Sequence, residues 1–272
     1  MSSKSRFLSI PYVVGMGIFV VVPIIMVVVY AFTNAQGSFT VDNFRGMGAY
    51  VSVFGRSFGL AIVATAVCIL IGYPLAYVLS REGARLQKIF IMLIMLPMWM
   101  NFLLRTYAWM SILEDTGLIN SLLAKLGLPG IHMINTSGAV VLGMVYNYLP
   151  FMVLPIYSVI SKLDRRLIEA AEDLGSTPVQ VFTRVVFPLS LPGVLSGITM
   201  VFVPSVSTFA ISQLLGGSRS ILLGDLIEMQ FLGSAYNPHL GSAIALVMMV
   251  IVLICMWIMN KFGAGEETAV MF

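Results

Sequence analysis

The chain has 272 residues, of which 59% are hydrophobic and only 10% are charged, and its mean hydropathy is +0.98. This small share of polar residues cannot cover the surface of a water-soluble globule. The composition therefore excludes a soluble protein and indicates a polytopic membrane protein. The net charge of +3 says little about nucleic acid, and no nucleic-acid partner is expected.

Six windows of about 20 apolar residues, the length that crosses a bilayer as a helix, occur along the chain. They cover residues 9–33, 57–80, 89–111, 138–160, 191–213 and 241–260. The windows are continuous rather than alternating, which argues against barrel strands, and a helix satisfies its own backbone in lipid. The sequence therefore predicts an all-α polytopic protein with six transmembrane helices, treated as one domain over residues 1–272.

The first window has two interpretations, because Lys4 and Arg6 precede it as basic residues precede the apolar core of a signal peptide. Its apolar run is longer than such a core and five further windows follow, so we favour an uncleaved helix. Cys68 and Cys255 both fall inside windows, where a thiol acts as a small apolar group, and no disulfide framework is expected.

Lys and Arg are distributed unequally between the two sides of the membrane. With a cytoplasmic N-terminus, ten of the 15 basic residues lie on the inner side and five on the outer side. The inner residues are Lys4, Arg6, Arg81, Arg85, Lys88, Lys162, Arg165, Arg166, Arg184 and Lys261, and the outer residues are Arg45, Arg56, Arg105, Lys125 and Arg219. Since cytoplasmic loops are enriched in Lys and Arg, both termini are expected in the cytoplasm.

A charged stretch between the fourth and fifth windows predicts a short amphipathic helix. Its apolar stripe consists of Leu163, Leu167, Ala170 and Leu174, and its charged face of Asp164, Arg165, Arg166, Glu169, Glu172 and Asp173. Gly175 is expected to end this helix, because glycine readily adopts φ > 0.

A second short helix is expected at once. Thr177 fits an N-cap, Pro178 fits the first helical position, and Gln180 completes a capping box. Pro188 and Pro192 are expected to end this helix before the fifth window. The sequence thus predicts a helix–turn–helix elbow over residues 162–190 in the cytoplasm. The elbow is either an interfacial loop folded onto the membrane surface or a docking surface for a cytoplasmic partner.

The elbow carries a family resemblance. Glu169-Ala170-Ala171, then Gly175, then Val185-Val186-Phe187-Pro188 resembles the EAA signature of permease subunits in bacterial ABC importers, with Val185 and Phe187 in place of the usual Ile and Leu. From about Ile71 onward, segments such as "NYLPFMVLPIYSVISKLD" make the chain similar to the spermidine/putrescine importer permeases, particularly those of the B type. The resemblance implies a type I ABC importer permease fold with a core at about 57–260, in the bacterial cytoplasmic membrane.

The resemblance also implies partners. These are a second, homologous permease, two copies of an ATP-hydrolysing subunit and an external binding protein, with a polyamine as the solute. The sequence lacks the G-x-x-x-x-G-K-[ST] phosphate loop. ATP and Mg²⁺ are therefore expected on the partner ATPase, with no cofactor and no catalytic residue on this chain. The residues expected to couple the pore to the ATPase are Glu169, Ala170, Ala171, Leu174, Gly175 and Pro188.

A polyamine route should offer carboxylates and aromatic faces to ammonium groups. The candidates are Trp99, Tyr107, Trp109, Glu114, Asp115, Tyr146, Asp225 and Glu228. Each has a simpler interpretation, since Trp and Tyr near helix ends anchor proteins at the interface and the last two acids suit the solvated face of a loop helix. Arg105 lies near the outer edge of the third window, where we expect Glu114 or Asp115 as its partner.

Two other function classes stay open. A permease of the same type for ferric iron or a small anion would keep the elbow but need different pore groups. A membrane enzyme or ion channel would need clustered acids, His ligands or a filter-like repeat, and none of these is apparent. His132 and His239 lie in different loops without Cys or acid at ligand spacing, so no metal site is expected.

Overall fold

The computed structural model describes residues 14–233 and 235–267. The α-helices are α2 (Val22–Ala31), α3 (Asp42–Gly46), α4 (Val51–Arg81), α5 (Ala84–Met95), α6 (Phe102–Leu113), α7 (Leu118–Lys125), α8 (Ser137–Ile160), α9 (Arg165–Asp173), α10 (Pro178–Val181), α11 (Phe187–Ser207), α12 (Leu223–Phe231) and α13 (Pro238–Glu267). Short 3₁₀ or π segments are η1 (Gly17–Val21), η2 (Met47–Tyr50), η3 (Leu96–Trp99), η4 (Phe182–Val186), η5 (Ser212–Gly216) and η6 (Gly217–Ser220). Within the described ranges the only β-pairing is the single bridge between Thr33 and Phe39, which confirms the all-α class.

Five helical segments of the described chain are long and apolar enough to cross a membrane. They are Val14–Ala31, Asp42–Arg81, Ser137–Ile160, Pro178–Ser207 and Pro238–Met259. They correspond to five of the six predicted windows, although residues 9–13 of the first window lie outside the described residues. The segments confirm a multi-pass membrane protein.

The third window was predicted as one continuous helix, and this is wrong. The segments Ala84–Trp99 and Phe102–Lys125 meet at an angle of 90°. Pro97 lies in η3, and Asn101 is extended and begins a new helix by accepting hydrogen bonds from the backbone N–H of Leu103 (2.8 Å) and Leu104 (3.4 Å). A proline followed by an N-cap residue therefore breaks an apolar run that hydropathy alone treats as one span.

The prediction that Pro188 and Pro192 separate the elbow from the fifth span is also wrong. Pro178–Ser207 is one apolar segment in which the π-helical turn η4 leads directly into α11. Pro188 occupies the first turn of α11, directly after a π turn that already departs from the regular α-helical hydrogen-bond ladder. The helix instead ends at Ser207, because Thr208 is extended with ψ 141°.

The described chain divides into two compact units, one formed by residues 14–53 and 226–253 and the other by residues 54–225 and 254–267. In the first, the Asn43 side-chain amide donates to the carbonyl oxygens of Ala31 (2.9 Å) and Thr33 (3.0 Å), which fixes the chain where it leaves α2. Nδ1 of His239 lies 3.1 Å from the carbonyl oxygen of Tyr30, which ties the start of α13 to the end of α2.

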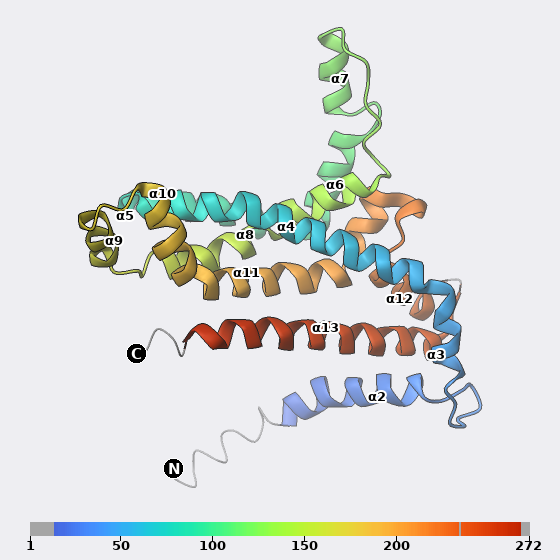
Figure 1. The fold of residues 1–272 in the computed structure, drawn as a ribbon. Coiled ribbons are helices and arrows are strands. Elements are labelled where there is room, and N and C mark those ends of the chain that lie inside the picture. Colours follow the sequence, from blue (N-terminus) through green and yellow to red (C-terminus); the bar gives the residue numbers. More distant parts are fainter. Residues whose placement is uncertain (1–13, 234, 268–272) are drawn as a thin grey trace. The chain divides into compact units, whose positions relative to one another are not determined.

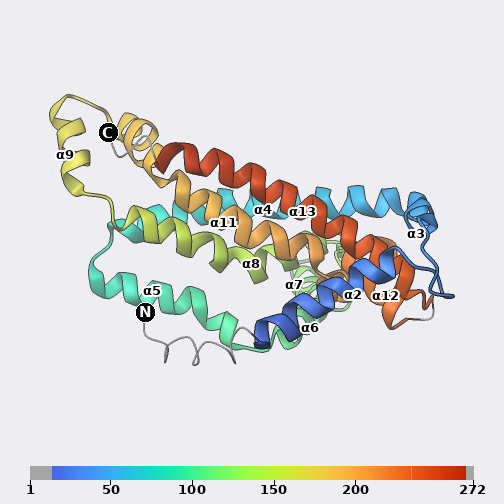
Figure 2. The ribbon, with the colours of Figure 1, turned by 90° about the horizontal axis from the view of Figure 1, so that it is seen from below.

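The second unit is built around α8 and α11, which lie side by side in both views (Figure 1, Figure 2). Their backbones approach closely, because a methyl group added at Gly193 would lie 2.9 Å from the carbonyl oxygen of Pro155. Packing through small residues of this kind is typical of helices in membranes, where apolar burial does not by itself drive association. Figure 1 also shows α9 at one end of these helices, and α6 and α7 standing off from them near the other end.

Candidate functional site

The first helix of the elbow is set by local hydrogen bonds at both ends. Asp164 is its N-cap, and the carboxylate accepts a 3.0 Å bond from the backbone N–H of Arg166. At the other end, the N–H of Gly175 donates to the carbonyl of Glu172 (2.8 Å) and the N–H of Ser176 to that of Ala171 (3.0 Å). These two bonds form a Schellman motif, which requires a left-handed residue, and Gly175 has φ +82°. The predicted helix end is confirmed.

The second helix begins as its sequence predicts. Thr177 accepts a bond from the N–H of Gln180 (3.4 Å) and its own N–H donates to the Gln180 side chain (2.8 Å), so the capping box is complete. The following turn packs on α4, where the ring of Phe182 lies edge-on to Tyr73 (5.7 Å) and Tyr77 (5.2 Å). The second helix is therefore anchored in the core, and the first extends from it.

The first helix presents two different faces. Leu167 is 49% exposed and Leu174 is 88% exposed, and with Ala170 they form one side of α9, which we call the outer face. At 100° per residue, Arg165, Glu169 and Glu172 lie on the opposite side. The predicted charged face with Arg165, Glu169 and Glu172 is therefore confirmed. The inclusion of Leu163 in the apolar stripe is wrong, because Leu163 precedes the helix and packs on the core.

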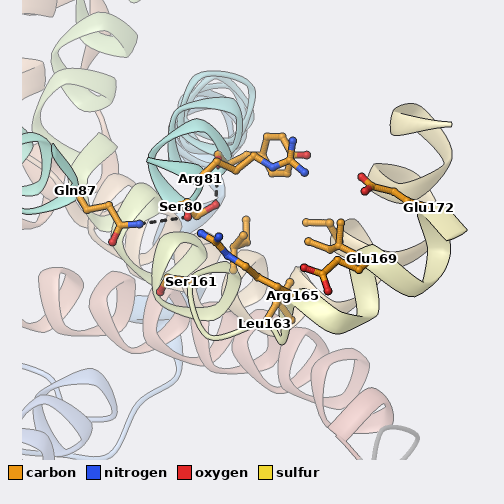
Figure 3. A pocket seen from close by; sticks show the side chains of 12 residues that line it. Ser80, Arg81, Gln87, Ser161, Leu163, Arg165, Glu169 and Glu172 are labelled. Atoms are coloured by element: carbon orange, nitrogen blue, oxygen red, sulfur yellow. Dashed lines mark hydrogen bonds between the residues drawn. The ribbon is translucent and has the colours of Figure 1, made fainter. Parts of the chain in front are cut away.

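A cavity of about 440 Å³ lies behind the face of α9 that carries Arg165, Glu169 and Glu172, and we call it the elbow cavity (Figure 3). Its lining comes from the ends of α4 and α8, from α5 and from α9. The Gln87 side chain is fixed at its wall by bonds to the carbonyl oxygens of Ser80 (3.3 Å) and Glu82 (2.8 Å) and from the hydroxyl of Tyr157 (2.9 Å).

The aromatic residues expected on a solute route are partly brought together. Trp109 on α6 and Tyr146 on α8 pack edge to face with ring centroids 5.3 Å apart. Trp99 and Tyr107 are both exposed and belong to neither described hydrophobic cluster.

The acids expected on the route have different local surroundings. Asp115 bonds Nδ1 of His132 at 2.8 Å, and the half-buried Glu114 follows α6 as its C-cap. Asp225 is only 4% exposed and accepts the N–H of Leu222 (2.7 Å), so its place on a solvated face is wrong. Glu228 is half-buried and belongs to the other compact unit. Asp225 thus lies in the first turn of α12 and accepts a backbone N–H from just before the helix, a role that acids at this position often take.

Arg105 does not pair with either acid expected as its partner. The residue is 8% exposed, and its Nε and Nη1 atoms are buried without a hydrogen-bond acceptor in the described structure. It lies on α6 one turn before Trp109, on a helix that packs against α8 and η5. The guanidinium is thus enclosed by the protein rather than presented to the exterior.

Residues 69–264 match the family described as "Binding-protein-dependent transport system inner membrane component". The chain is 36% identical over 250 residues to the spermidine/putrescine transport system permease protein PotB of Haemophilus influenzae, covering 88% of this chain and 87% of the relative. It is 34% identical over 244 residues to PotB of Escherichia coli, covering 86% and 88%.

Solved structures share the fold. A chain of a bacterial ABC transporter involved in the import of the acidic polysaccharide alginate superposes with a TM-score of 0.79 at 17% identity, covering 96% of this chain and 95% of that one. A chain of the MetNI methionine ABC transporter, in an inward-facing conformation, gives 0.58 at 20% identity, covering 83% and 98%.

These similarities identify the class as the permease component of an ABC importer with the type I fold, which is a transport subunit and not an enzyme. The chain belongs to the family of binding-protein-dependent transport system inner membrane components.

Proposed function

We propose that this chain forms half of the translocation pathway of an ATP-driven polyamine importer, with spermidine or putrescine as the solute. The observation that carries the proposal is the 36% identity, over 88% of the chain, to a spermidine/putrescine permease. The other half is a second permease, two ATPase copies bind ATP and Mg²⁺, and an external binding protein delivers the solute.

The elbow is the proposed coupling device. The outer face of α9 would seat Leu167, Ala170 and Leu174 in an apolar groove of the ATPase. The exposed Leu174 is the largest unpartnered apolar contribution to that face. Because the second helix is anchored on α4 through Phe182, movement of the docked elbow would be transmitted to α4 and α11 as rigid-body rocking.

The proposed orientation places the elbow and both termini in the cytoplasm, as the distribution of Lys and Arg favours. A single cysteine at Ser176, with Cys68 and Cys255 replaced, should react with a membrane-impermeant thiol reagent only in inside-out vesicles. Labelling in intact cells would contradict the orientation.

The proposed solute route includes fewer residues than the eight candidates. The Trp109–Tyr146 pair joins two helices of one compact unit and offers aromatic faces suited to ammonium or methylene groups. Asp225 is engaged at the start of α12, so we do not assign it to the route.

Reconstitution of the whole importer tests the solute. Binding protein loaded with spermidine or putrescine should stimulate ATP hydrolysis and drive uptake into proteoliposomes, whereas the same binding protein without solute should not. Stimulation by a ferric-iron or anion binding protein in its place, with no response to polyamine, would overturn the polyamine assignment while leaving the permease class intact.

A further inference from the structure

A polar side chain without a hydrogen-bond donor lies inside the membrane-spanning part of the second compact unit. Asn147 stands near the middle of the 24-residue helix α8, and the residue is only 2% exposed. Its Nδ2 atom donates to the carbonyl oxygen of Gly143 at 2.9 Å, whereas Oδ1 is buried without a donor in the described structure. Exchange of the two amide atoms would set two acceptors against each other, so this hydrogen bond identifies the unpaired atom as an oxygen.

The unpaired oxygen lowers the stability of the folded chain. A buried acceptor that loses its hydrogen bond to water carries the full cost of desolvation, and a leucine of similar size at Asn147 would remove that cost. Polar groups inside membrane spans commonly lie on the path of a solute or an ion. The amide of Asn147 therefore suits a donor that comes from outside the described chain.

Two contacts place this part of α8 beside the end of α11. The Tyr148 hydroxyl donates to the carbonyl oxygen of Pro204 (3.4 Å), and a methyl group at Gly143 would lie 2.8 Å from the Ile211 side chain. Helix α11 ends between these two contacts. Because residues four apart share one face of a helix, Asn147 lies on the face of α8 that Gly143 turns toward this region.

The end of α11 is electrostatically negative. Its last carbonyl oxygens form the negative end of the helix dipole, and Thr208 leaves the helix in an extended conformation. In membrane transporters, helices that are interrupted within the bilayer bind cations through such carbonyl oxygens. An acceptor on α8 and a negative helix end on α11 together favour a cation that donates several hydrogen bonds.

We propose that Asn147 Oδ1 and the C-terminal end of α11 form a subsite for one primary ammonium group of the solute. The inference rests on the proposed function, because spermidine and putrescine carry primary ammonium groups at their ends. Asn147 would accept one of the three hydrogen bonds of the ammonium, and the helix end would stabilise its charge. Tyr146, the preceding residue, belongs to the aromatic pair assigned to the route, so the subsite would extend that route along α8.

The subsite is enclosed in the described conformation. The first turn of α12 covers the end of α11, since a methyl group at Gly224 would lie 2.6 Å from the carbonyl oxygen of Ser207. A solute would therefore reach Asn147 only when these segments separate, as alternating access requires. A neutral amide holds an ammonium less strongly than a carboxylate does, which suits a step that must also release the solute.

The test is reconstitution of the complete importer into proteoliposomes, with binding protein saturated by spermidine or putrescine. Asn147→Leu should lower uptake per ATP hydrolysed about tenfold, the loss expected for one charge-assisted hydrogen bond. Stimulation of ATP hydrolysis by the loaded binding protein should persist, because the elbow is unchanged. Asn147→Asp retains an acceptor and should support more uptake than Asn147→Leu. Thr65→Val, which removes a buried hydroxyl bonded within α4 (2.7 Å to the carbonyl of Ala61), should leave uptake unchanged.

A measurement on the wild type keeps the proposal testable if Asn147→Leu does not assemble. A diamine with fully methylated, quaternary nitrogens cannot donate hydrogen bonds, so at saturation of the binding protein its uptake per ATP hydrolysed should be about tenfold lower than that of the unmethylated diamine.

The outcomes separate this subsite from the proposed function. Equal rates for the two diamines, or unchanged polyamine uptake in Asn147→Leu, would overturn the subsite and leave the polyamine importer intact. A purely structural role, such as a shared contact with Arg105 on α6, predicts an altered thermal stability of Asn147→Leu with unchanged uptake. Absence of polyamine uptake by the wild type would reject the proposed function together with the subsite.

Discussion

The elbow and the α6–α7 segment are both pairs of short helices joined by a turn that contains glycine, yet different forces hold them. In the elbow, every hydrogen bond that shapes the turn joins residues at most five positions apart. In the α6–α7 segment, the Asn120 side chain donates to the carbonyl oxygens of Glu114 (3.2 Å) and Ile131 (3.0 Å) and accepts the N–H of Ile131 (2.8 Å). Bonds between near neighbours in sequence therefore fix the elbow turn. The α6–α7 turn depends on the three hydrogen bonds of the Asn120 side chain, which we call the Asn120 clamp.

The two segments also differ in what they leave unsatisfied. The elbow exposes an apolar face whose leucines contact water unless a partner covers them, as expected of a docking surface. The α6–α7 segment instead carries the buried Arg105 at its base, with two donor atoms that lack an acceptor in the described structure. We therefore propose that the elbow, rather than the α6–α7 segment, meets another protein, and variants in each segment test this difference.

The largest effect is expected from a charge on the outer face of α9. Leu174→Glu should lower co-purification of the ATPase by more than tenfold, since a central apolar contact is worth about 2 kcal/mol or more and a buried carboxylate adds a desolvation cost. Leu126→Glu is the matched control, because Leu126 is also a highly exposed leucine, at 73%, but directly follows α7. Equal loss in both variants, measured by quantitative pull-down, would remove the distinction between the segments.

A smaller effect is expected at the turn itself. A methyl group at Gly175 would meet no atom within 4 Å, so crowding does not penalise Gly175→Leu. The substitution instead destabilises the turn through the backbone, because Gly175 has φ +82°. A residue with a Cβ loses about 1–2 kcal/mol in this conformation, which lowers the population of the native turn roughly 5- to 30-fold. Gly175→Asn should cost less, because Asn tolerates this conformation. If Asn and Leu reduce ATP-coupled uptake equally, backbone strain is not the cause.

The smallest effect is expected in the α6–α7 segment. Asn120→Ala removes three hydrogen bonds and should loosen the segment by about 1–3 kcal/mol without affecting ATPase binding. Hydrogen exchange should accelerate at the amide of Ile131, which loses its acceptor. Ser121→Ala, which removes only a 3.5 Å exposed contact, should leave that amide unchanged. Unchanged exchange in Asn120→Ala would show that the clamp does not hold the turn.

This contrast also explains what the sequence could predict. The start and end of α9 and the capping box follow from Asp164, Gly175 and Thr177, each of which acts on neighbours within a few residues, so their types and spacing suffice. The break at Asn101 was missed because the flanking apolar runs together have the length of a span. Hydropathy gives no information about the angle between two such runs.

The solute route was hardest to predict, because the place of each side chain depends on tertiary contacts. Asp225 and Glu228 are one helical turn apart in sequence, yet the first is buried at a helix start and the second is half-buried. Similarly, nothing local indicates that Asp115 pairs with His132, since 17 positions separate them. By contrast, helical periodicity alone predicts that Glu169 faces away from Leu174.

Cysteine cross-linking of the two faces of α9 tests the central claim most directly. In a chain with Cys68→Ser and Cys255→Ser, single cysteines at Leu174 and at Glu172 would be compared for disulfide formation with cysteines along the apolar groove of the ATPase, in the assembled importer. The account predicts rapid cross-linking from Leu174→Cys and none from Glu172→Cys. Cross-linking from Glu172→Cys alone would show that the ATPase meets the charged face and would contradict the assignment of the outer face as the coupling surface.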